Sequence, residues 1–224
     1  MVTRLAWRPS YRIIPSRYPY VSVYDRVSDP RDLEAIVEIE QLTNPRVRLE
    51  LGNLALVRAE DRVTGPGTTP IMASFAYTGS SRFSDGTFGV YYAAHTEQTA
   101  IAETKYHAER RLRATNEPSI DLDMRVYSAT IKGDFDDVRK RTPRSKLYDP
   151  NSYALSQTYG KKKYQQNSVD GIVYRSVRDS DGECLAAFRP RLITRCAATK
   201  YLQYRWNGER IVHVAEIGLR ASDV

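Results

Sequence analysis

The second half of the sequence is a succession of short runs of β-branched and aromatic residues separated by turn residues, and this pattern constrains the fold most strongly. Such runs are typical of β-strands. We expect strands at Arg125 to Lys132, Gly171 to Arg175, Cys184 to Arg189, Leu192 to Cys196, Tyr201 to Trp206 and Arg210 to Val214. The turn Asp179-Ser180-Asp181-Gly182 is typical of a hairpin between two of them.

Helical patterns lie mainly before these strands. A stripe of apolar residues predicts a helix from Asp29-Pro30 to about Thr43. A second helix follows a strand at Phe88 to Ala94, with Thr96 as its cap and its end near Arg113, and a third is expected from Asp149-Pro150 to Gln166. Helices early and strands late predict a single α+β domain covering residues 1–224.

Other segments predict less regular structure. Tyr11 to Tyr24 favours an extended edge strand or a loop, because Pro15 and Pro19 fix the backbone and donate no hydrogen bond. Val47 to Val57 is ambiguous between helix and strand. We expect loops at Thr64 to Pro70 and at Gly79 to Gly86, and a mobile loop from Gly133 to Lys146.

Composition narrows the classes of function. The 224 residues are 41% hydrophobic, which suffices for a sizeable core, and no apolar run approaches the roughly 18 residues of a membrane span. Cys184 and Cys196 lack the paired spacing of a zinc site, so reduced thiols in a cytoplasm are expected. Loops and helices typical of nucleotide-binding folds, serine hydrolases and zincins are missing.

The chain carries a net charge of +7, which favours an anionic partner. The densest basic groups, Arg110 to Arg113, Arg139 to Arg141 and Lys161 to Lys163, are short and scattered. We therefore interpret them as solvated faces rather than as a nucleic-acid-binding stripe.

Few residues suggest chemistry by themselves. His95, His107 and His213 are far apart in the sequence, and no metal site is expected. Cys184 lies in an apolar run and is expected to be a small core residue. Glu103 stands among small and apolar residues near the start of a helix, where a buried carboxylate needs a partner, and pairing with a lysine is the plainer explanation.

Three other polar residues stand at positions from which they could reach a cleft. Arg82 lies in a Gly/Ser-rich loop, where it could equally be a solvated arginine. Tyr91 and Tyr92 alternate along a strand, so that one should face the core and the other a cleft or solvent. Ser176 ends a strand, where a hydroxyl most often caps a turn.

Taken together, these residues resemble the RES domain family of bacterial toxin–antitoxin pairs, and the resemblance covers roughly Tyr11 to Arg191. The motifs that carry it are Tyr11-Arg12-Ile13, Ser80-Ser81-Arg82-Phe83, Tyr92-Ala93-Ala94, Ala100-Ile101-Ala102-Glu103 and Tyr174-Arg175-Ser176. The spacing of ten residues from Arg82 to Tyr92 and of eleven from Tyr92 to Glu103 also fits the family. Ser80 departs from it, since glycine is common there, and residues at about 24–69 form an N-terminal insertion relative to shorter members.

The resemblance implies an ADP-ribosyltransferase-like fold, similar to that of diphtheria toxin, with mixed small sheets flanked by helices. It also implies a toxin that uses NAD as a substrate and releases nicotinamide. The ADP-ribosyl group would pass to inorganic phosphate, as in an NAD phosphorylase, or to a protein or water, and the residues leave this acceptor open. No cofactor other than the substrate NAD, and no metal, is implied.

The resemblance assigns catalytic roles to Arg82, Tyr92, Glu103 and Ser176. Cleavage of the bond between ribose and nicotinamide develops positive charge on the sugar, which the carboxylate of Glu103 can stabilise. Arg82 offers a planar fork to the NAD pyrophosphate or to phosphate, with Arg12 as a weaker candidate for the same anion. Tyr92 would stack against the nicotinamide, and Ser176 would donate to a phosphate or ribose oxygen.

The family also implies a partner, an Xre-type DNA-binding antitoxin that blocks the active site. DNA would then be contacted through the antitoxin, in an oligomeric complex. Two alternatives stay open from the sequence. One is an ADP-ribosyltransferase that modifies a protein; the other is a non-catalytic basic module for nucleic acid, which the net charge of +7 and the 16 tyrosines would suit.

Overall fold

The computed structural model describes residues 1–16, 23–26, 29–32, 35, 53–142 and 145–218. Its strands are β1 (Val2–Pro15), β2 (Tyr91–Ala94), β3 (Ile120–Asp137), β4 (Gly171–Arg175), β5 (Glu183–Ala187), β6 (Ile193–Trp206) and β7 (Ile211–Ile217). Its α-helices are α1 (Val23–Arg26), α4 (Thr69–Ala76), α5 (Glu97–Ala114) and α6 (Ala154–Gln166), with 3₁₀ turns at Pro30–Asp32, Leu54–Leu56, Ala59–Asp61, Lys146–Tyr148 and Pro190–Leu192. The expected α+β class is confirmed.

The strands join into one seven-stranded mixed sheet in the order β1-β2-β5-β4-β3-β6-β7. Most neighbours are antiparallel, and β3 with β4 is the parallel pair. The strand β1 pairs with β3 along its length and also meets β2 where Tyr11 lies opposite Ala94. Because β1 has both partners, the pairing closes into a ring of β1, β2, β5, β4 and β3, from which β6 and β7 extend.

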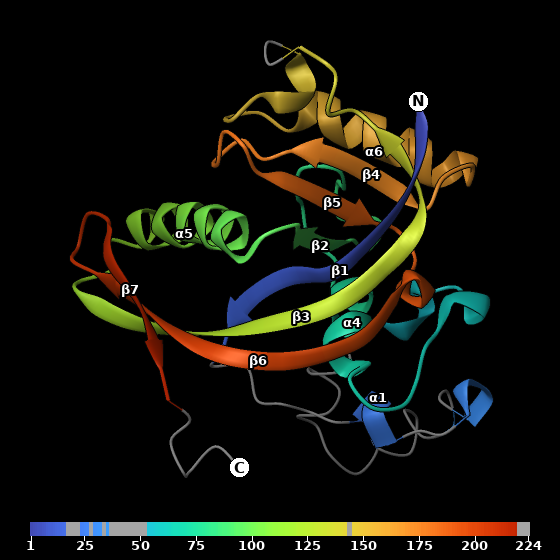
Figure 1. The fold of residues 1–224 in the computed structure, drawn as a ribbon, viewed down its shortest axis with the longest axis horizontal. Helices are drawn as coiled ribbons and strands as arrows, with labels where there is room; N and C mark the ends of the chain where they lie inside the picture. Colours follow the sequence, from blue (N-terminus) through green and yellow to red (C-terminus); the bar gives the residue numbers. More distant parts are fainter. Residues whose placement is uncertain (17–22, 27–28, 33–34, 36–52, 143–144, 219–224) are drawn as a thin grey trace.

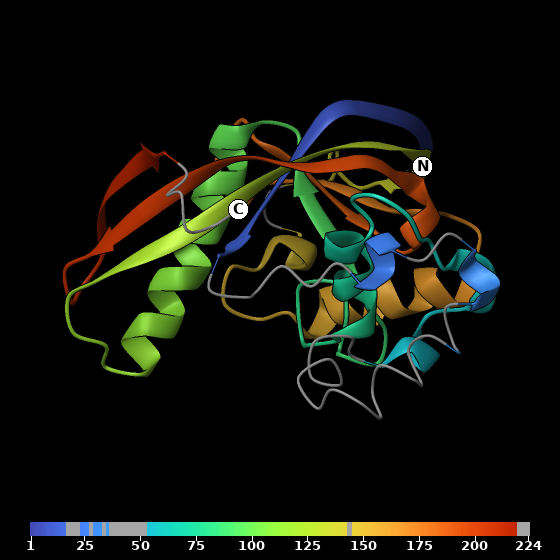
Figure 2. The same cartoon turned by 90° about the horizontal axis from the view of Figure 1, so that it is seen from below.

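Helices cover the sheet in two places. In Figure 1, α6 runs along β4 and β5, whereas the long curved strands β1, β3 and β6 form the other part, with α5 lying between the two. The view from below in Figure 2 shows α5 and α6 well separated along the molecule, with α4 on the same side as α6. The closing seam of the ring, at Tyr11 and Ala94, thus lies close to the start of α5.

Two apolar clusters occupy opposite faces of the strands. One contains Phe75 of α4, Tyr91 and Val173, and the other contains Ala108 of α5, Tyr174 and Phe188. Alternation along β2 and β4 sends neighbouring side chains to different clusters, as the period of two requires. Tyr91 is buried while Tyr92 is half-buried, which confirms the expected split between core and cleft.

Local chemistry explains where α5 begins. Thr96 has extended backbone angles, and its hydroxyl accepts a hydrogen bond from the amide of Thr99 at 3.2 Å. Glu97 adds negative charge in the first turn, and Arg111 and Arg113 add positive charge in the last, as the helix dipole favours. The cap predicted at Thr96 is confirmed, and the helix ends at Ala114, one residue beyond the expected end.

Several predicted boundaries are wrong. The cap at Asp149-Pro150 is not used, since α6 begins at Ala154 with Tyr153 as its cap, and the carboxylate of Asp149 closes a turn onto the amides of Asn151 and Ser152. The edge or loop expected from Tyr11 to Tyr24 is wrong up to Pro15, because these residues end β1, which pairs with β3 and, at Tyr11, also with β2; residues 17–22 lie outside the described residues. The loop expected from Thr64 to Pro70 is wrong at its end, because α4 begins at Thr69 and continues to Ala76, where no helix was predicted.

Several strand lengths also differ from those expected: β3 and β7 are longer, whereas β2 begins at Tyr91 rather than Phe88 and β5 ends at Ala187 rather than Arg189. The predicted mobile loop from Gly133 to Lys146 is wrong up to Asp137, because β3 continues to that residue beside β1 and β4. The two strands expected at Leu192 to Cys196 and Tyr201 to Trp206 are one strand, β6. Of the helix expected from Asp29-Pro30 to about Thr43, the described start Pro30–Asp32 is a 3₁₀ turn, and residues 36–43 lie outside the described residues. In the insertion at about 24–69, residues 27–28, 33–34 and 36–52 lie outside them.

Candidate active site

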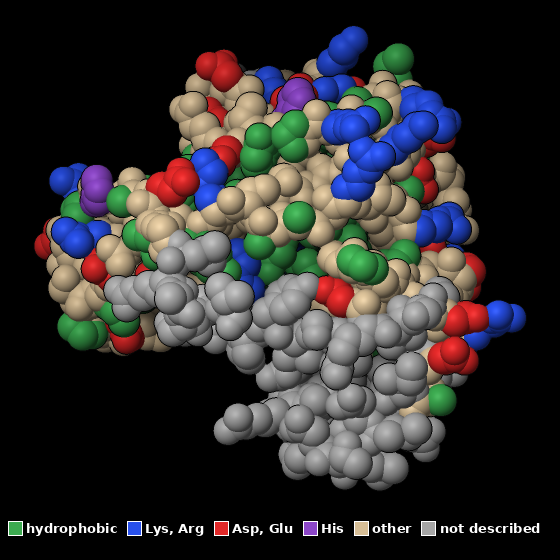
Figure 3. Space-filling model, turned by 60° about the horizontal axis from the view of Figure 1, so that its bottom comes forward, with side chains coloured by type: hydrophobic (Ala, Val, Ile, Leu, Met, Phe, Trp, Pro, Cys, Tyr) green, Lys and Arg blue, Asp and Glu red, His purple; other side chains and the backbone are tan. Residues whose placement is uncertain are grey.

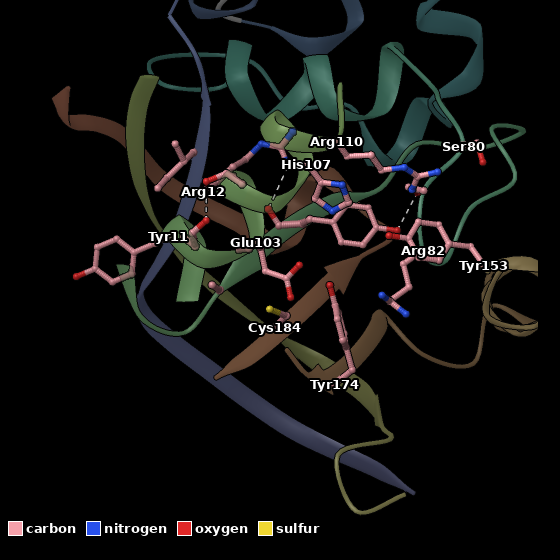
Figure 4. Close-up of a pocket in the computed structure, with 17 residues that line it drawn as sticks. Tyr11, Arg12, Ser80, Arg82, Glu103, His107, Arg110, Tyr153, Tyr174 and Cys184 are labelled. Carbon is pink, nitrogen blue, oxygen red and sulfur yellow. Dashed lines mark hydrogen bonds between the residues drawn. The ribbon is translucent and has the colours of Figure 1, made fainter. Parts of the chain in front are cut away.

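The candidate site is a cavity of about 380 Å³ beside the closing seam of the ring. It is lined from β1, the loop before β2, β2 itself, α5, the segment before α6, β4 and β5. Figure 4 shows the polar side chains that point into it, among them Arg12, Arg82, Glu103, His107 and Arg110. Distant parts of the chain therefore bring one carboxylate and several cationic or neutral donors to a single cavity that is open on one side.

Glu103 lies on the wall that α5 forms, and its carboxylate has a fixed orientation. Oε1 accepts a hydrogen bond from the hydroxyl of Ser176 at 2.6 Å and another from the amide of Val177 at 3.2 Å. Oε2 makes no hydrogen bond to any described residue. Two donors on one oxygen hold the carboxylate and leave the other oxygen free for a ligand, so the pairing with a lysine that the sequence favoured is wrong.

Ser176 is 8% exposed and lies beside the lining residues rather than among them. Its oxygen accepts hydrogen bonds from the amides of Arg178 and Asp179, both at 3.0 Å, which is the turn-capping arrangement expected of such a hydroxyl. The hydroxyl has one hydrogen, and the structure directs it to Glu103. Donation to a phosphate or ribose oxygen stays a prediction.

The β-turn that follows Ser176 is also hydrogen-bonded to the start of α5. Asp179 accepts a hydrogen bond from the hydroxyl of Thr99 at 2.7 Å, and the amide of Gly182 donates to the carbonyl of Asp179 at 3.1 Å. The predicted hairpin turn therefore joins β4 to β5 and also fixes the helix that carries Glu103.

Arg82 is 7% exposed, so the prediction of a solvated loop arginine is wrong. Its Nη1 donates to the carbonyls of Leu147 and Asp149 at 3.1 and 3.2 Å, and the guanidinium stacks on the ring of Tyr153 at 4.7 Å. These contacts with described residues use one nitrogen of the fork. The rest of the fork remains for an anion in the cavity.

Tyr92 lines the cavity with its ring and holds the loop of Arg82 with its hydroxyl. The hydroxyl accepts from the amide of Phe83 at 2.9 Å and shares a hydrogen bond with the hydroxyl of Ser81 at 2.9 Å. Burial raises the pKa of this phenol to about 12, so it stays protonated. Stacking on nicotinamide remains a prediction, and the anchoring of the loop is a role that the sequence did not reveal.

Arg12 reaches the cavity from β1 at the seam. Its Nη1 donates to the carbonyl of Tyr92 at 3.1 Å, and its guanidinium lies over the ring of Tyr91 at 4.8 Å. The structure thus brings Arg12, Arg82, Tyr92 and Glu103 to one cavity, with Ser176 behind Glu103.

Other lining residues were not identified from the sequence as part of a site. His107 and Arg110 follow Glu103 on α5, and Tyr153, Tyr174 and Cys184 complete the wall near Arg82. The spacing of Glu103, His107 and Arg110 by four and three residues could have indicated them, because such positions share one helical face. Cys184 is buried as expected, and burial raises the pKa of its thiol well above the usual value.

The departure at Ser80 has a local explanation. The Ser80 hydroxyl accepts a hydrogen bond from the side-chain amide of Gln157 at 2.8 Å, and the same amide donates to the carbonyl of Ser81 at 2.9 Å. The serine therefore adds a contact between the loop of Arg82 and α6 that a glycine could not make.

Charge on the surface is distributed unevenly. On the face drawn in Figure 3, basic side chains gather in one group near β1 and β3, and acidic and basic side chains are mixed elsewhere. No group of three or more potential metal ligands forms among the described residues. No helix in the described part of the chain is long and apolar enough to cross a membrane.

The fold and the site define an α+β domain with a cavity that presents a fixed carboxylate opposite arginine side chains. The RES domain family profile matches residues 55–207, and the chain belongs to this family. The matched range includes the motifs from Ser80 to Ser176 and leaves out Tyr11-Arg12-Ile13.

Two similar proteins complete the comparison. The uncharacterized protein y4oC of Sinorhizobium fredii strain NGR234 is 32% identical over 203 residues, which are 90% of this chain and 84% of that protein. A chain of the M. tuberculosis MbcT–MbcA toxin–antitoxin complex aligns over 92% of this chain and 87% of its own length, with a TM-score of 0.46 and 9% identity.

Proposed function

We propose that this protein is the toxin of a toxin–antitoxin pair and that it depletes NAD in the cytoplasm by cleaving the bond between nicotinamide and ribose. The observation that carries the proposal is the carboxylate of Glu103, held through Oε1 by Ser176 and Val177 with Oε2 open to the cavity. Membership of the RES domain family supports the same activity. The acceptor of the ADP-ribosyl group that we propose is inorganic phosphate.

The reaction divides into bond cleavage and capture. The electron pair of the bond between C1 of the ribose and the nicotinamide nitrogen leaves with nicotinamide, and the sugar becomes an oxocarbenium-like cation. The preorganised carboxylate of Glu103 stabilises this charge, and it does so more strongly in a protein cavity than in water. A phosphate oxygen then supplies the electron pair for the new bond to C1, so that ADP-ribose phosphate and nicotinamide are the products.

The other residues act on the charged parts of the substrate. Part of the guanidinium of Arg82 makes no hydrogen bond to a described residue. It can bind one phosphate through two parallel N–H hydrogen bonds, which a lysine could not do. Tyr92 offers the face of its ring to an aromatic leaving group. An Xre-type antitoxin, bound in an oligomeric complex with DNA contacts of its own, would inhibit the reaction by covering the cavity.

The proposal is tested by following NAD and its products by chromatography with purified protein, with and without inorganic phosphate. Phosphate-dependent loss of NAD with release of nicotinamide is expected. Glu103→Gln keeps the shape of the side chain and removes its charge, and it should lower the rate about 100- to 1,000-fold. Glu97→Gln is the matched control, because it makes the same chemical change on α5 at a residue that pairs with Lys200.

The remaining outcomes identify other acceptors or other functions. Nicotinamide release without phosphate would indicate water, and transfer of label from NAD to protein would indicate protein modification. NAD that stays intact in the presence of phosphate and of protein acceptors would disprove the proposal. Nucleic-acid binding with a steep dependence on salt, unaffected by Glu103→Gln, would then favour the basic binding module.

A further inference from the structure

The outer end of the cavity is formed by two α5 residues that follow Glu103 on the same face. His107 and Arg110 both line the cavity, together with Ala100, Glu103 and Thr104 of the same helix. Positions three, four and seven apart lie along one side of an α-helix, with a rise of about 1.5 Å per residue. His107 is therefore about 6 Å and Arg110 about 10 Å farther along the helix axis than Glu103.

Arg110 differs from the other arginines around the cavity in having no hydrogen-bond or ion-pair partner among the described residues. Arg82 donates to two carbonyls, and Arg12 donates to the carbonyl of Tyr92. Arg178, near the same wall, lies over the ring of Tyr106 at 3.3 Å and donates to the carbonyl of Pro150 at 2.9 Å. The full fork of Arg110 is thus available at the edge of the cavity.

His107 adds hydrogen-bonding capacity without adding charge. Its ring packs edge-on against Tyr106 at 5.3 Å, and its nitrogens make no hydrogen bond to a described residue. Desolvation lowers the pKa of this imidazole, the nearby Arg178, Arg82 and Arg110 lower it further, and Glu103 opposes them. The ring is therefore neutral at neutral pH, with one N–H to donate and one nitrogen to accept.

We propose that Arg110 and His107 form a second phosphate-binding point, farther along α5 from the seam than Glu103. Figure 4 shows His107 close to Glu103 and the side chain of Arg110 extending from there toward the loop that carries Ser80 and Arg82. A guanidinium binds a phosphate group through two parallel N–H bonds, and the neutral imidazole can take a third oxygen or a P–OH hydrogen. The inference rests on the proposed function and gives that function a phosphate-binding point in addition to Arg82.

The charge balance favours such a ligand. Arg12, Arg82 and Arg110 surround a single carboxylate, so the walls of the cavity carry an excess of positive charge. A field of one sign within low-dielectric walls raises the local concentration of an oppositely charged ligand. The phosphate has two possible sources, the pyrophosphate of the dinucleotide and the free phosphate that accepts the ADP-ribosyl group.

The test compares Arg110→Gln and His107→Gln with Arg111→Gln. Arg111 is exposed, lies on the same helix and does not line the cavity, so its substitution removes the same charge from a different face. Dissociation constants are measured by calorimetry or by ligand NMR for two probes, ADP-ribose and inorganic phosphate. We expect Arg110→Gln to raise the dissociation constant of at least one probe about tenfold or more, and His107→Gln to raise that of the same probe less. Arg111→Gln should leave both dissociation constants within about twofold of those of the unaltered chain.

The two probes distinguish the sources. Weaker ADP-ribose binding with unchanged phosphate binding assigns the point to the pyrophosphate, and the reverse result assigns it to the acceptor. Equal affinities in Arg110→Gln and Arg111→Gln overturn the proposal, as does an unaltered chain that binds neither probe. If the unaltered chain releases no nicotinamide and still binds ADP-ribose through Arg110, the proposed function fails and the phosphate-binding point stands.

Discussion

Single residues decide which groups in the cavity are free to act, and Ser176 is the clearest case. Its hydroxyl donates its hydrogen to Oε1 of Glu103 and accepts hydrogen bonds from two backbone amides. It therefore connects the turn after β4 to the carboxylate. In this geometry Ser176 is a positioning residue, because it acts through Glu103. Its loss should leave a mobile carboxylate rather than an empty binding site.

Ser176→Ala removes the shorter of the two hydrogen bonds on Glu103 and leaves the amide of Val177. We expect kcat for NAD cleavage to fall about ten- to hundredfold, with KM for NAD nearly unchanged, because the substrate-facing groups stay in place. Ser176→Thr keeps a hydroxyl and should recover part of kcat. Steady-state kinetics with both substrates would measure this, and a rise in KM with kcat preserved would instead identify Ser176 as a substrate contact.

The sequence indicated the residues that line the cavity better than their hydrogen-bond partners. Arg12, Arg82, Tyr92 and Glu103 line one cavity as expected, since each is tied to a short motif. The partner of Glu103 could not be identified from local sequence, because Ser176 lies 73 residues later and reaches it through the pairing of β4 and β5. The burial of Arg82 could not be predicted for the same reason, because the carbonyls that bind it belong to Leu147 and Asp149, far along the chain.

Among the elements, α6 determines the position of the loop that carries Arg82. One face of the helix, spaced by three and four residues, contacts this loop. Gln157 donates to Ser80 and Ser81, and Lys161 pairs with Asp85 at 2.7 Å. Between them, Gly160 lets the helix backbone approach the carbonyl of Phe83 so closely that an added Cβ would lie 2.1 Å from its oxygen.

Gly160→Ala sets two effects against each other. Alanine favours the helix by about 1 kcal/mol, whereas forcing a methyl group into a packed contact costs about 1–3 kcal/mol. Because the obstacle is backbone and cannot rotate away, we expect a net loss of stability and a higher KM for NAD as Arg82 moves. Denaturant unfolding and kinetics would measure both. Lys162→Ala, at an exposed position of the same helix, should change neither, and a stabilised Gly160→Ala variant with normal KM would contradict this account.

The sequence predicted the bounds of some helices and strands better than those of others. The helix from Glu97 was predicted well because its cap, first-turn acid and last-turn arginines are all local signals. The lengths of β3 and β6 were underestimated and that of β2 was overestimated, because pairing between strands overrides local propensity. Gly133 suggested a loop, yet it lies inside β3 where an added Cβ would meet the side chain of Asp170 at 2.7 Å, and the small residue permits that approach.

For the whole molecule, the arrangement depends on contacts between segments that the sequence alone could not pair. The ring closes where Tyr11 meets Ala94, and the cavity opens at that seam. An α+β class follows from the order of patterns, but closure depends on one register between strands far apart in the chain. The same kind of long-range contact joins the segment before α4 to the sheet.

Asp61 and Arg189 form that contact as a buried ion pair at 3.4 Å, with the two residues 3% and 2% exposed. Arg189 also donates to the side chain of Asn167 at the end of α6 and stacks on Tyr164 at 5.0 Å, and Arg191 adds a second ion pair to Asp61. The pair therefore connects the 3₁₀ turn Ala59–Asp61, the end of α6 and the segment after β5.

Removing one member of this pair should destabilise the whole molecule, because the other loses its buried partner of opposite charge. We expect Asp61→Leu to lower the free energy of unfolding by about 3–5 kcal/mol, because Arg189 is left buried without a carboxylate, and Arg189→Met to lower it less, because Arg191 still pairs with Asp61. The double variant Asp61→Leu with Arg189→Met should lose much less than the sum, since an apolar pair of similar volume has no charge to desolvate. Denaturant unfolding of the four proteins measures this coupling. Additive losses would show that the two residues act independently and that the 3₁₀ turn Ala59–Asp61 is held to the sheet by other contacts.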